Sequence, residues 1–262
     1  MRRISFDTQP IGAAVVGTGR WTLSEATPSR VTIEAGAEVE LIIENQPAKL
    51  QLTLERDARL RVVHVITEAG VHSSLGVNLR ENAECRVAQV ITAATESGVE
   101  VSLAGSGASF ELGGVFLLSG DQRSGVRVDV RHDVSDCRSR TLYKGVASGS
   151  ARGEFSGIVY VAPDAQRTDS EQLSRNITMA DAHIATRPQL EIYADDVRCS
   201  HGATVGQLDD QAVLYMRQRG LSLEMAKRLQ IEGFVSDVVL HAPIAECCET
   251  LVEILHEKLQ SL

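Results

Sequence analysis

The sequence predicts a mainly β protein, a β-helix made of short strands, followed by a small C-terminal α-helical subdomain. Apolar and polar residues alternate with a period of two over residues 31 to about 162, which is typical of strands with one buried face. A corner motif recurs through the same region, and helical periodicity begins only after residue 206. We therefore expect a solenoid over residues 1–206, with an irregular lead-in over 1–30, and a helical subdomain over 207–262.

The first strands follow one another without intervening helices. Alternation is clear over residues 31–34, 38–43, 50–54 and 60–66, and it returns over 189–194. No helical stretch of ten or more residues separates the early strands, which argues against a βαβ sheet. A propeller needs about 40 residues for each blade, so the shorter repeat favours a solenoid. A β-sandwich is the alternative; it would explain the strands but not the recurring corner.

The corner motif is a turn-forming residue, an alanine, any residue and then an apolar residue. Glycine, aspartate and asparagine suit a tight or left-handed turn, and the small alanine suits a buried corner. The alanines are 21, 25 and 25 residues apart, at Ala37, Ala58, Ala83 and Ala108. Weaker copies occur over residues 135–137 and 150–152. A drifting period of this size indicates a solenoid, with Cys85 and Phe110 in its core and His64 and His72 on strands or loops.

Helix signals begin after the last predicted strand. Asp209 or Asp210 can cap a first helix over residues 211–219, which Gly220 ends. Ser222 can cap a second helix that runs to about Gly233, with residues 234–240 continuing it after a kink. Pro243 opens a third helix, whose apolar residues recur at helical spacing: Ile244, Cys247, Cys248, Leu251, Leu255 and Leu259.

Composition excludes several classes of protein. The net charge of −9 disfavours a nucleic-acid partner, because phosphate binding rests on clustered Lys and Arg. The five cysteines are odd in number and sparse, so we expect reduced thiols rather than a disulfide framework. No apolar run reaches the roughly 18 residues of a membrane helix, and residues 1–7 lack the apolar region of a secretion signal. The expected location is the cytoplasm.

The candidate site is the pair Cys199 and His201. On a strand, residues two apart point to the same face, and thiolate and imidazole both bind metals or cluster iron. The pair supplies only two ligands where a stable site needs about four, so the others would come from another strand or another chain. Asp195, Asp196 and Arg198 complete this polar cluster. The alternative is a strand end with a packed thiol whose polar neighbours bond the backbone.

Other chemical motifs are weak or missing. The sequence has no G-x-x-x-x-G-K-[ST] phosphate loop, no C-x-x-C and no G-x-S-x-G elbow. Cys247 and Cys248 could join His241 or His256 in a metal site, but neighbouring cysteines on an amphipathic helix are more typical of packing. Because β-helices also carry polysaccharide lyases and hydrolases, an enzyme that acts on carbohydrate is one alternative. A stand-alone metal-binding protein is another.

Residues 190–206, L-E-I-Y-A-D-D-V-R-C-S-H-G-A-T-V-G, resemble the C-terminal signature of the SufB/SufD family of iron–sulfur cluster assembly scaffolds. The resemblance is to the SufD-like side of that family. Residues 214–221 are similar to its F-Y-x-x-x-R-G-I segment, and residues 144–146, 153–157 and 165–169 match it in order. His132 and Cys137 stand where the family often has H-x-x-x-x-C. The similarity covers about residues 31–262.

The resemblance implies a right-handed parallel β-helix and a small helical subdomain. It implies a non-catalytic scaffold that pairs with a SufB-like chain or with itself and docks a SufC-type ABC ATPase. The missing phosphate loop fits a protein whose ATPase is a separate chain. His201 would act in cluster formation near a chain interface, with Cys199 carried by the same motif. A transient Fe–S cluster is expected at that interface, and none is expected to be held tightly by the isolated chain. The residues implied for partner binding are Asp210, Leu214, Tyr215, Arg217, Arg219 and Gly220.

Two departures from the family pattern matter. SufB has E-H-E-A-T where residues 200–204 here read S-H-G-A-T, and it has a cluster-linked cysteine upstream, whereas residues 169–176 contain none. A SufB-like cluster site within this chain alone is therefore not expected. About 30 residues precede the first repeat, so the sequence is expected to be a short form that lacks the helical N-terminal domain of longer members.

Overall fold

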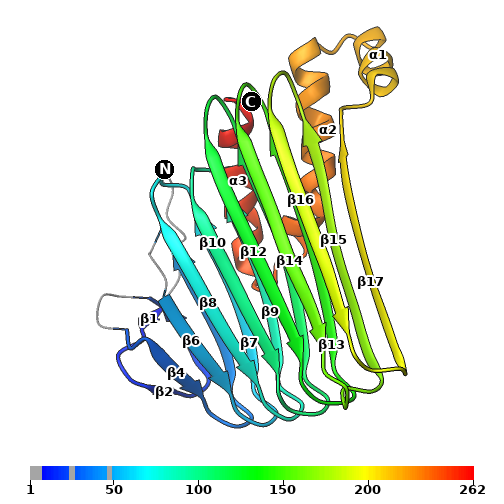
Figure 1. The fold of residues 1–262 in the computed structure, drawn as a ribbon. Helices are drawn as coiled ribbons and strands as arrows, with labels where there is room; N and C mark the ends of the chain where they lie inside the picture. Colours follow the sequence, from blue (N-terminus) through cyan, green and yellow to red (C-terminus); the bar gives the residue numbers. More distant parts are fainter. Residues whose placement is uncertain (1–7, 24–26, 46–48) are drawn as a thin grey trace.

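The computed structural model describes residues 8–23, 27–45 and 49–262. Within them the chain winds as a parallel β-solenoid, in which successive strands alternate between two facing parallel sheets (Figure 1). Sheet A has the order β1-β3-β5-β7-β9-β11-β13-β15-β17, and sheet B has the order β16-β14-β12-β10-β8-β6-β4-β2. Each turn of the solenoid thus adds one strand to each sheet, as the alternating sequence and its recurring corner predict.

The strands lengthen along the chain. Those of sheet A are β1 (Gln9–Pro10), β3 (Gly19–Thr22), β5 (Glu38–Glu44), β7 (Arg59–Ile66), β9 (Glu84–Ile91), β11 (Ser109–Leu118), β13 (Arg138–Ala147), β15 (Thr168–Thr178) and β17 (Val197–Gly206). Those of sheet B are β2 (Val15–Val16), β4 (Arg30–Ile33), β6 (Lys49–Leu54), β8 (His72–Leu79), β10 (Glu96–Leu103), β12 (Arg123–His132), β14 (Arg152–Val161) and β16 (His183–Ile192).

The expected irregular lead-in over 1–30 is wrong for its described part, because β1, β2 and β3 pair into the sheets. Residues 1–7 and 24–26 of that lead-in lie outside the described residues.

The predicted corners stack on one another. Gly36, Asp57, Asn82 and Gly107 all have positive φ, and the alanine after each is buried, with Ala58 and Ala83 0% exposed. The column continues with Asp136 before Cys137 and Arg167 before Thr168, which occupy the same corner in the last turns. The weaker copy over 150–152 lies between β13 and β14, at the opposite edge of the solenoid. Left-handed backbone at these points turns the chain sharply from sheet B into sheet A.

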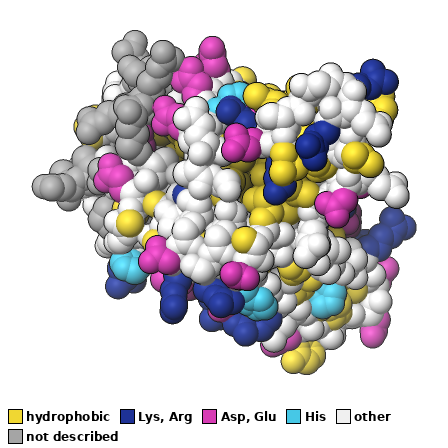
Figure 2. Space-filling view, turned by 90° about the horizontal axis from the view of Figure 1, so that it is seen from above, with side chains coloured by type: hydrophobic (Ala, Val, Ile, Leu, Met, Phe, Trp, Pro, Cys, Tyr) yellow, Lys and Arg dark blue, Asp and Glu magenta, His cyan; other side chains and the backbone are white. Residues whose placement is uncertain are grey.

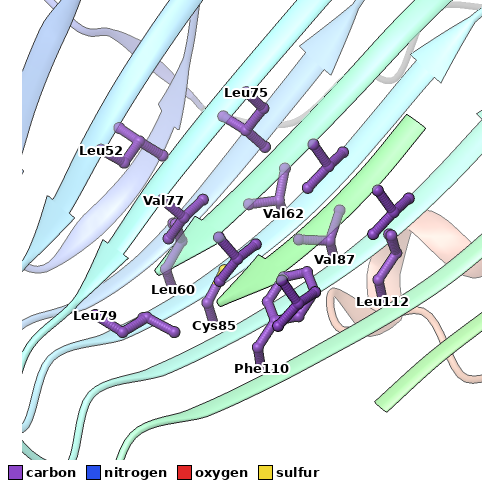
Figure 3. Close-up of a cluster of buried hydrophobic side chains, with 14 of the residues drawn as sticks. Leu52, Leu60, Val62, Leu75, Val77, Leu79, Cys85, Val87, Phe110 and Leu112 are labelled. Atoms are coloured by element: carbon purple, nitrogen blue, oxygen red, sulfur yellow. The ribbon is translucent and has the colours of Figure 1, made fainter. Parts of the chain in front are cut away.

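Inward-facing side chains of both sheets form the main core (Figure 3). Leu60, Cys85 and Phe110 are register neighbours on β7, β9 and β11, and each is at most 2% exposed. Cys85 and Phe110 are thus core residues, as expected, and burial raises the pKa of the Cys85 thiol. His64 and His72 lie on strands β7 and β8. The column that starts with Leu60 changes character after Phe110, since its next members are Ser139 and Ser170.

The C-terminal helices are α1 (Asp210–Gln218), α2 (Leu223–Leu240), the 3-10 turn η1 (Ala245–Cys247) and α3 (Cys248–Leu259). Asp209 caps α1, Ser222 caps α2, and Gly220 has a φ of 94° after α1, all as predicted. Residues 234–240 continue the second helix beyond Gly233, as predicted, within the single helix Leu223–Leu240. Ile231, Val235, Val238 and Val239 of this helix are buried, and their packing outweighs the roughly 1 kcal/mol cost of an internal glycine.

Helices α2 and α3 cover the outer face of sheet A, whereas no helix of the described residues covers the outer face of sheet B (Figure 1). A second core joins the outward residues of sheet A, such as Val63, Val90 and Leu117, to apolar residues of α2 and α3. Lys144 on β13 fastens α2 to the sheet, since its Nζ donates to the two carboxylate oxygens of Asp237 at 2.7 and 2.8 Å and to the carbonyl of Phe234 at 2.6 Å. None of the helices in the described part of the chain is both long and apolar enough to cross a bilayer.

Candidate functional site

The solenoid ends in two neighbouring edge strands, β16 in sheet B and β17 in sheet A (Figure 1). Each has ten residues, and each pairs on one side only, β16 with β14 and β17 with β15. We call this end, formed by residues 183–192 and 197–206, the open end. Its strands present unpaired backbone groups and the rim of the interior, which is the arrangement that pairs most readily with another strand.

Cys199 and His201 lie on β17, on the face that points into the solenoid. Their Cα partners on β15 are Ser170 and Gln172, both at most 2% exposed, and Cys199 packs against the main core. Strand periodicity places His201 on the same face as Cys199. Because no strand follows β17, Cys199 is half-buried and His201 is exposed. Both side chains therefore stand at the open end with polar neighbours beneath them.

The interior below this pair is more polar than that of most earlier turns, which also bury His64 and Gln89 among their apolar residues. Ser170, Gln172, Ser174 and Asn176 follow one another at every second position of β15, and none is more than 3% exposed. A hydrogen-bonded row continues inward, with His132 Nε2 2.9 Å from Ser139 Oγ, which is 2.8 Å from Ser170 Oγ. The last turns thus bury a continuous row of hydroxyls and amides on β15, whereas the inward residues of the preceding turns are mostly Leu, Val and Phe.

Several of these groups have no hydrogen-bond partner among the described residues. Both amide atoms of Gln172, Oδ1 of Asn176, Nδ1 of His132 and Oγ1 of Thr186 are buried and unpaired. Asn176 does use its Nδ2, which donates to Ser174 Oγ at 3.0 Å and to the Thr204 carbonyl at 3.1 Å. A buried amide without a partner costs stability, so its presence beside a candidate site points to a use in binding.

Burial dominates the electrostatics of the thiols here. It raises the pKa of Cys199, while a hydrogen bond with the Ser170 backbone and the charge of Arg140 act in the opposite direction. Arg140 is itself held by Asp169 through two 2.8 Å hydrogen bonds. Cys199 is therefore a protonated thiol in this state, and it becomes a good ligand only when a metal displaces its proton.

The rest of the predicted polar cluster does not converge on this pair. Asp195 and Asp196 lie exposed in the turn between β16 and β17, where Asp196 is tied to Gln166 and Arg167 through its backbone. Arg198 is exposed on the outward face of β17, since strand residues alternate. Across the described residues, no group of three or more His, Cys, Asp or Glu could hold a metal ion. Cys199 and His201 thus offer two donors at an open rim.

The alternative metal site in the helices is not assembled. Cys247 is buried in the second core, and burial raises its pKa to about 12. His241 lies 2.7 Å from the Asp237 carbonyl through Nδ1, and His256 lies 3.4 Å from Glu232. Cys247 and Cys248 both pack against the second core, as small apolar residues on a helix do.

His132 and Cys137 are structural neighbours of the site rather than part of its rim. Burial lowers the pKa of His132 to about 4, so the ring is neutral. Burial also raises the pKa of Cys137 to about 11, and its thiol donates to the Gly105 carbonyl at 3.3 Å.

The residues expected to bind a partner gather on α1. Leu214 and Tyr215 are each 55% exposed, whereas the preceding residue, Val213, is buried. The Arg219 guanidinium lies over the Tyr215 ring at 4.5 Å. Asp210, Arg217 and Gly220 are also exposed. We call the exposed face formed by Leu214, Tyr215 and Arg219 the α1 face; it lies beyond the end of the solenoid (Figure 1).

Sequence reasoning missed the polar interior of β15. The signal was available, because residues 170, 172, 174 and 176 are Ser, Gln, Ser and Asn, whereas the alternate inward positions of the earlier strands are mostly apolar. A period-two polar row inside a solenoid is as informative as a motif, once the inward face of the strand is known.

Comparisons with known proteins agree with the resemblance in residues 190–206. A family model described as SUF system FeS cluster assembly, SufBD core domain, matches residues 24–234. The iron–sulfur cluster assembly protein SufD of Escherichia coli is 42% identical over 113 residues, which are 43% of this chain and 27% of that protein. A SufBD family protein of Synechocystis is 37% identical over 130 residues, covering 49% of this chain and 29% of the relative. A SufBD family protein of Mycobacterium tuberculosis is 27% identical over 279 residues, covering 98% of this chain and 70% of the relative. The chain thus spans less than a third of the first two relatives.

Proposed function

The chain belongs to the SufBD family of iron–sulfur cluster assembly proteins, and from that premise we propose that it is a non-catalytic scaffold subunit. In this proposal it pairs with a SufB-like chain or with a second copy of itself, and it docks a SufC-type ABC ATPase. The nascent cluster is the cargo of the complex, and it forms at the interface between two chains.

The open end is the observation that carries the proposal. Two adjacent ten-residue edge strands can each add a strand from another chain, which extends both sheets at once. Large apolar side chains are exposed along this rim, with Ile192 38%, Tyr193 60% and Val205 47% exposed. Burying them against a second solenoid provides a driving force for association. A family relative with its own open end is the best-fitting partner, because its strands have the same spacing.

Association also completes the ligand set. Cys199 and His201 supply a thiol and an imidazole, and the remaining ligands come from the facing chain. Cluster sulfurs are stabilised by hydrogen-bond donors, and the unpaired Gln172 amide lies in the row next to His201. The role of this chain is to hold these groups in place and to exclude water once the rim is covered.

Docking of the ATPase is assigned to the α1 face. Tyr215 and Leu214 are exposed aromatic and aliphatic anchors, and Arg219 adds a charge beside them. Helix α1 begins at Asp210, shortly after β17 ends at Gly206, while α2 is fastened to sheet A by Lys144 and Asp237. A pull on α1 would therefore act on β17, the strand that carries His201. ATP-driven dimerisation of the ATPase can work through this link if it favours one of two arrangements of the open end.

Light scattering coupled to size exclusion tests the pairing. The chain alone and its mixture with a SufB-like chain from the same cell are compared across a range of concentrations. The proposal expects a complex of two chains, formed either with that partner or with a second copy. Monomers in both samples at all concentrations would contradict it. A variant with Val205→Lys and Ile192→Lys at the rim is expected to remain folded and to stay monomeric.

A further inference from the structure

The uncovered outer face of sheet B contains a groove with a volume of about 820 Å³, which runs across β8, β10, β12, β14 and β16. Small residues lie on its floor, where larger side chains would fill the space: Ser74 and Gly98 are register neighbours, and Gly125, Ser156 and Ala185 lie on the three strands that follow in the sheet. A Cβ added at Gly98 would meet nothing closer than the Ser73 carbonyl at 3.9 Å. The volume lies within the range of small-molecule pockets, roughly 300–1,000 Å³.

One wall of the groove is a row of two arginines and a histidine. Arg123, Arg152 and His183 are register neighbours on β12, β14 and β16. Adjacent strands are about 4.8 Å apart, so two guanidinium groups start from neighbouring backbone positions. Like charges opposite one another on neighbouring strands are destabilising. This row therefore has an electrostatic cost in the free chain that an anion between the two arginines would relieve.

These two arginines differ from others on the same sheet. Arg127 pairs with Asp129 at 2.7 Å, Arg131 pairs with Asp133 at 3.1 Å, and Arg187 pairs with Glu154. Arg123 and Arg152 form no ion pair with any residue that the structure describes. Both guanidinium groups are thus free to bind an anion, although the chain as a whole has a net charge of −9 and many carboxylates. Figure 2, which views the molecule from above, shows Lys, Arg and His side chains gathered along its lower margin.

The groove also contains one acid that is not neutralised by a neighbouring arginine. Glu96 extends over Gly125, where an added Cβ would collide with its carboxylate. Glu154, the other acid of the lining, is paired with Arg187. A ligand therefore meets cations at one side and a hydrogen-bond acceptor near the floor. No Phe, Tyr or Trp side chain lines the described groove, so it lacks a large aromatic platform for stacking a base.

We infer that this groove binds a small phosphorylated polyol or sugar. Its phosphate lies between Arg123 and Arg152, whose guanidinium forks match phosphate oxygens. Its hydroxyls donate to Glu96 and lie over the small residues of the floor. The inference rests on the outer face of sheet B and is independent of the proposed cluster site at the open end.

Titration calorimetry with ribose 5-phosphate, inorganic phosphate and ribose tests the inference. Wild-type chain is expected to bind ribose 5-phosphate more tightly than inorganic phosphate, and ribose least. Arg123→Gln and Arg152→Gln should each raise the Kd for ribose 5-phosphate about tenfold, since each removes charge-assisted hydrogen bonds. Arg80→Gln is the matched control, because Arg80 is exposed at the opposite end of β8 and forms no ion pair with a described residue. It should bind as the wild type does.

Two further variants separate charge from shape. Gly98→Val adds side-chain atoms to the floor, at a position where a Cβ meets nothing closer than 3.9 Å, and should weaken binding of ribose 5-phosphate while inorganic phosphate binds as before. Glu96→Gln should weaken the binding of ribose 5-phosphate and leave the binding of inorganic phosphate unchanged. The chain is also mixed with phosphatidylglycerol vesicles and centrifuged. If the wild type sediments with the vesicles and the Arg123 and Arg152 variants do not, the groove binds the same phosphate chemistry in a lipid headgroup. Failure of the wild type to bind any of these phosphates, or equal binding by the arginine variants, would overturn the inference.

Discussion

Gln172 on β15 and His201 on β17 are Cα partners in the parallel ladder, so a buried amide without a partner lies in the row directly beneath an exposed imidazole. The two residues mark the change from a sealed interior to a rim. A group that costs stability in the free chain is retained at the place where a second chain and a cluster are proposed to meet.

Gln172→Leu should therefore separate stability from function. Removing an unpaired buried amide should leave the free energy of unfolding unchanged or raise it by about 1 kcal/mol, while cluster assembly falls. Urea unfolding and the iron and sulfide content of the purified complex measure the two effects. Gln189→Leu, the same change at an exposed position of β16, should alter neither. A Gln172→Leu chain that is strongly destabilised would show that the amide is already satisfied.

Tyr215→Ala should weaken docking of the ATPase. An exposed aromatic anchor that becomes buried at an interface is typically worth about 2 kcal/mol, or roughly 30-fold in Kd. Surface plasmon resonance with an immobilised SufC-type ATPase measures the loss. Gln218→Ala on the same helix is the control, and its affinity should equal that of the wild type. Equal affinities for all three chains would remove the α1 face from the docking site.

The link between Lys144 and Asp237 predicts an asymmetry in stability. Asp237→Asn leaves a buried ammonium without its counter-charge, with the Phe234 carbonyl and an amide oxygen as its acceptors, and should cost about 2–4 kcal/mol. Lys144→Met leaves a carboxylate that is half exposed to water, so it should cost less. Urea unfolding provides both values. Arg228→Met, which breaks an ion pair within α2, should cost less than either, at most about 1 kcal/mol. The reverse order for Lys144 and Asp237 would contradict this account.

Two buried histidines predict acid sensitivity. Burial lowers the pKa of both His64 and His132 to about 4, below the value near 6.5 of an unfolded chain. Between these values the unfolded chain binds more protons than the folded chain, so the free energy of unfolding falls as pH falls from about 6.5 to about 4. Each histidine contributes up to about 1.4 kcal/mol per pH unit in that window.

Urea unfolding at pH 7.5, 6.5, 5.8 and 5.2 measures this slope. Replacing His64 with Leu should make the slope shallower, because one of the two groups no longer binds a proton on unfolding. A wild-type stability that stays constant from pH 6.5 to 5.2 would show that these rings are already protonated in the folded chain.

Local chemistry made much of the fold predictable. Ala58, Ala83 and Ala108 mark the corner because a left-handed turn residue and a small buried residue are needed together there. Asp209 and Ser222 mark helix starts because their side chains satisfy free backbone N–H groups. Helix α2 runs through Gly233, because the contacts of Ile231 and Val235 with sheet A outweigh the poor helix propensity of glycine.

The candidate site was predictable only in part. Period two placed Cys199 and His201 on one face of β17, whereas it also placed Arg198 on the other face and so divided the polar cluster. The contact of Gln172 with this site and the groove beside Arg123 and Arg152 depend on register between strands. Register is set by turn lengths that vary along the chain, so sequence spacing alone does not give it.

The most direct test of the proposed function is the iron and sulfide content of the complex after anaerobic co-expression with a SufB-like chain and a SufC-type ATPase. Wild type, His201→Ala and Arg198→Ala are compared, since residues 198 and 201 are both exposed on β17 but lie on opposite faces. The account predicts that all three complexes assemble, that Arg198→Ala contains as much cluster as the wild type, and that His201→Ala has lost most of it. A His201→Ala complex with the wild-type content of iron and sulfide would contradict the account.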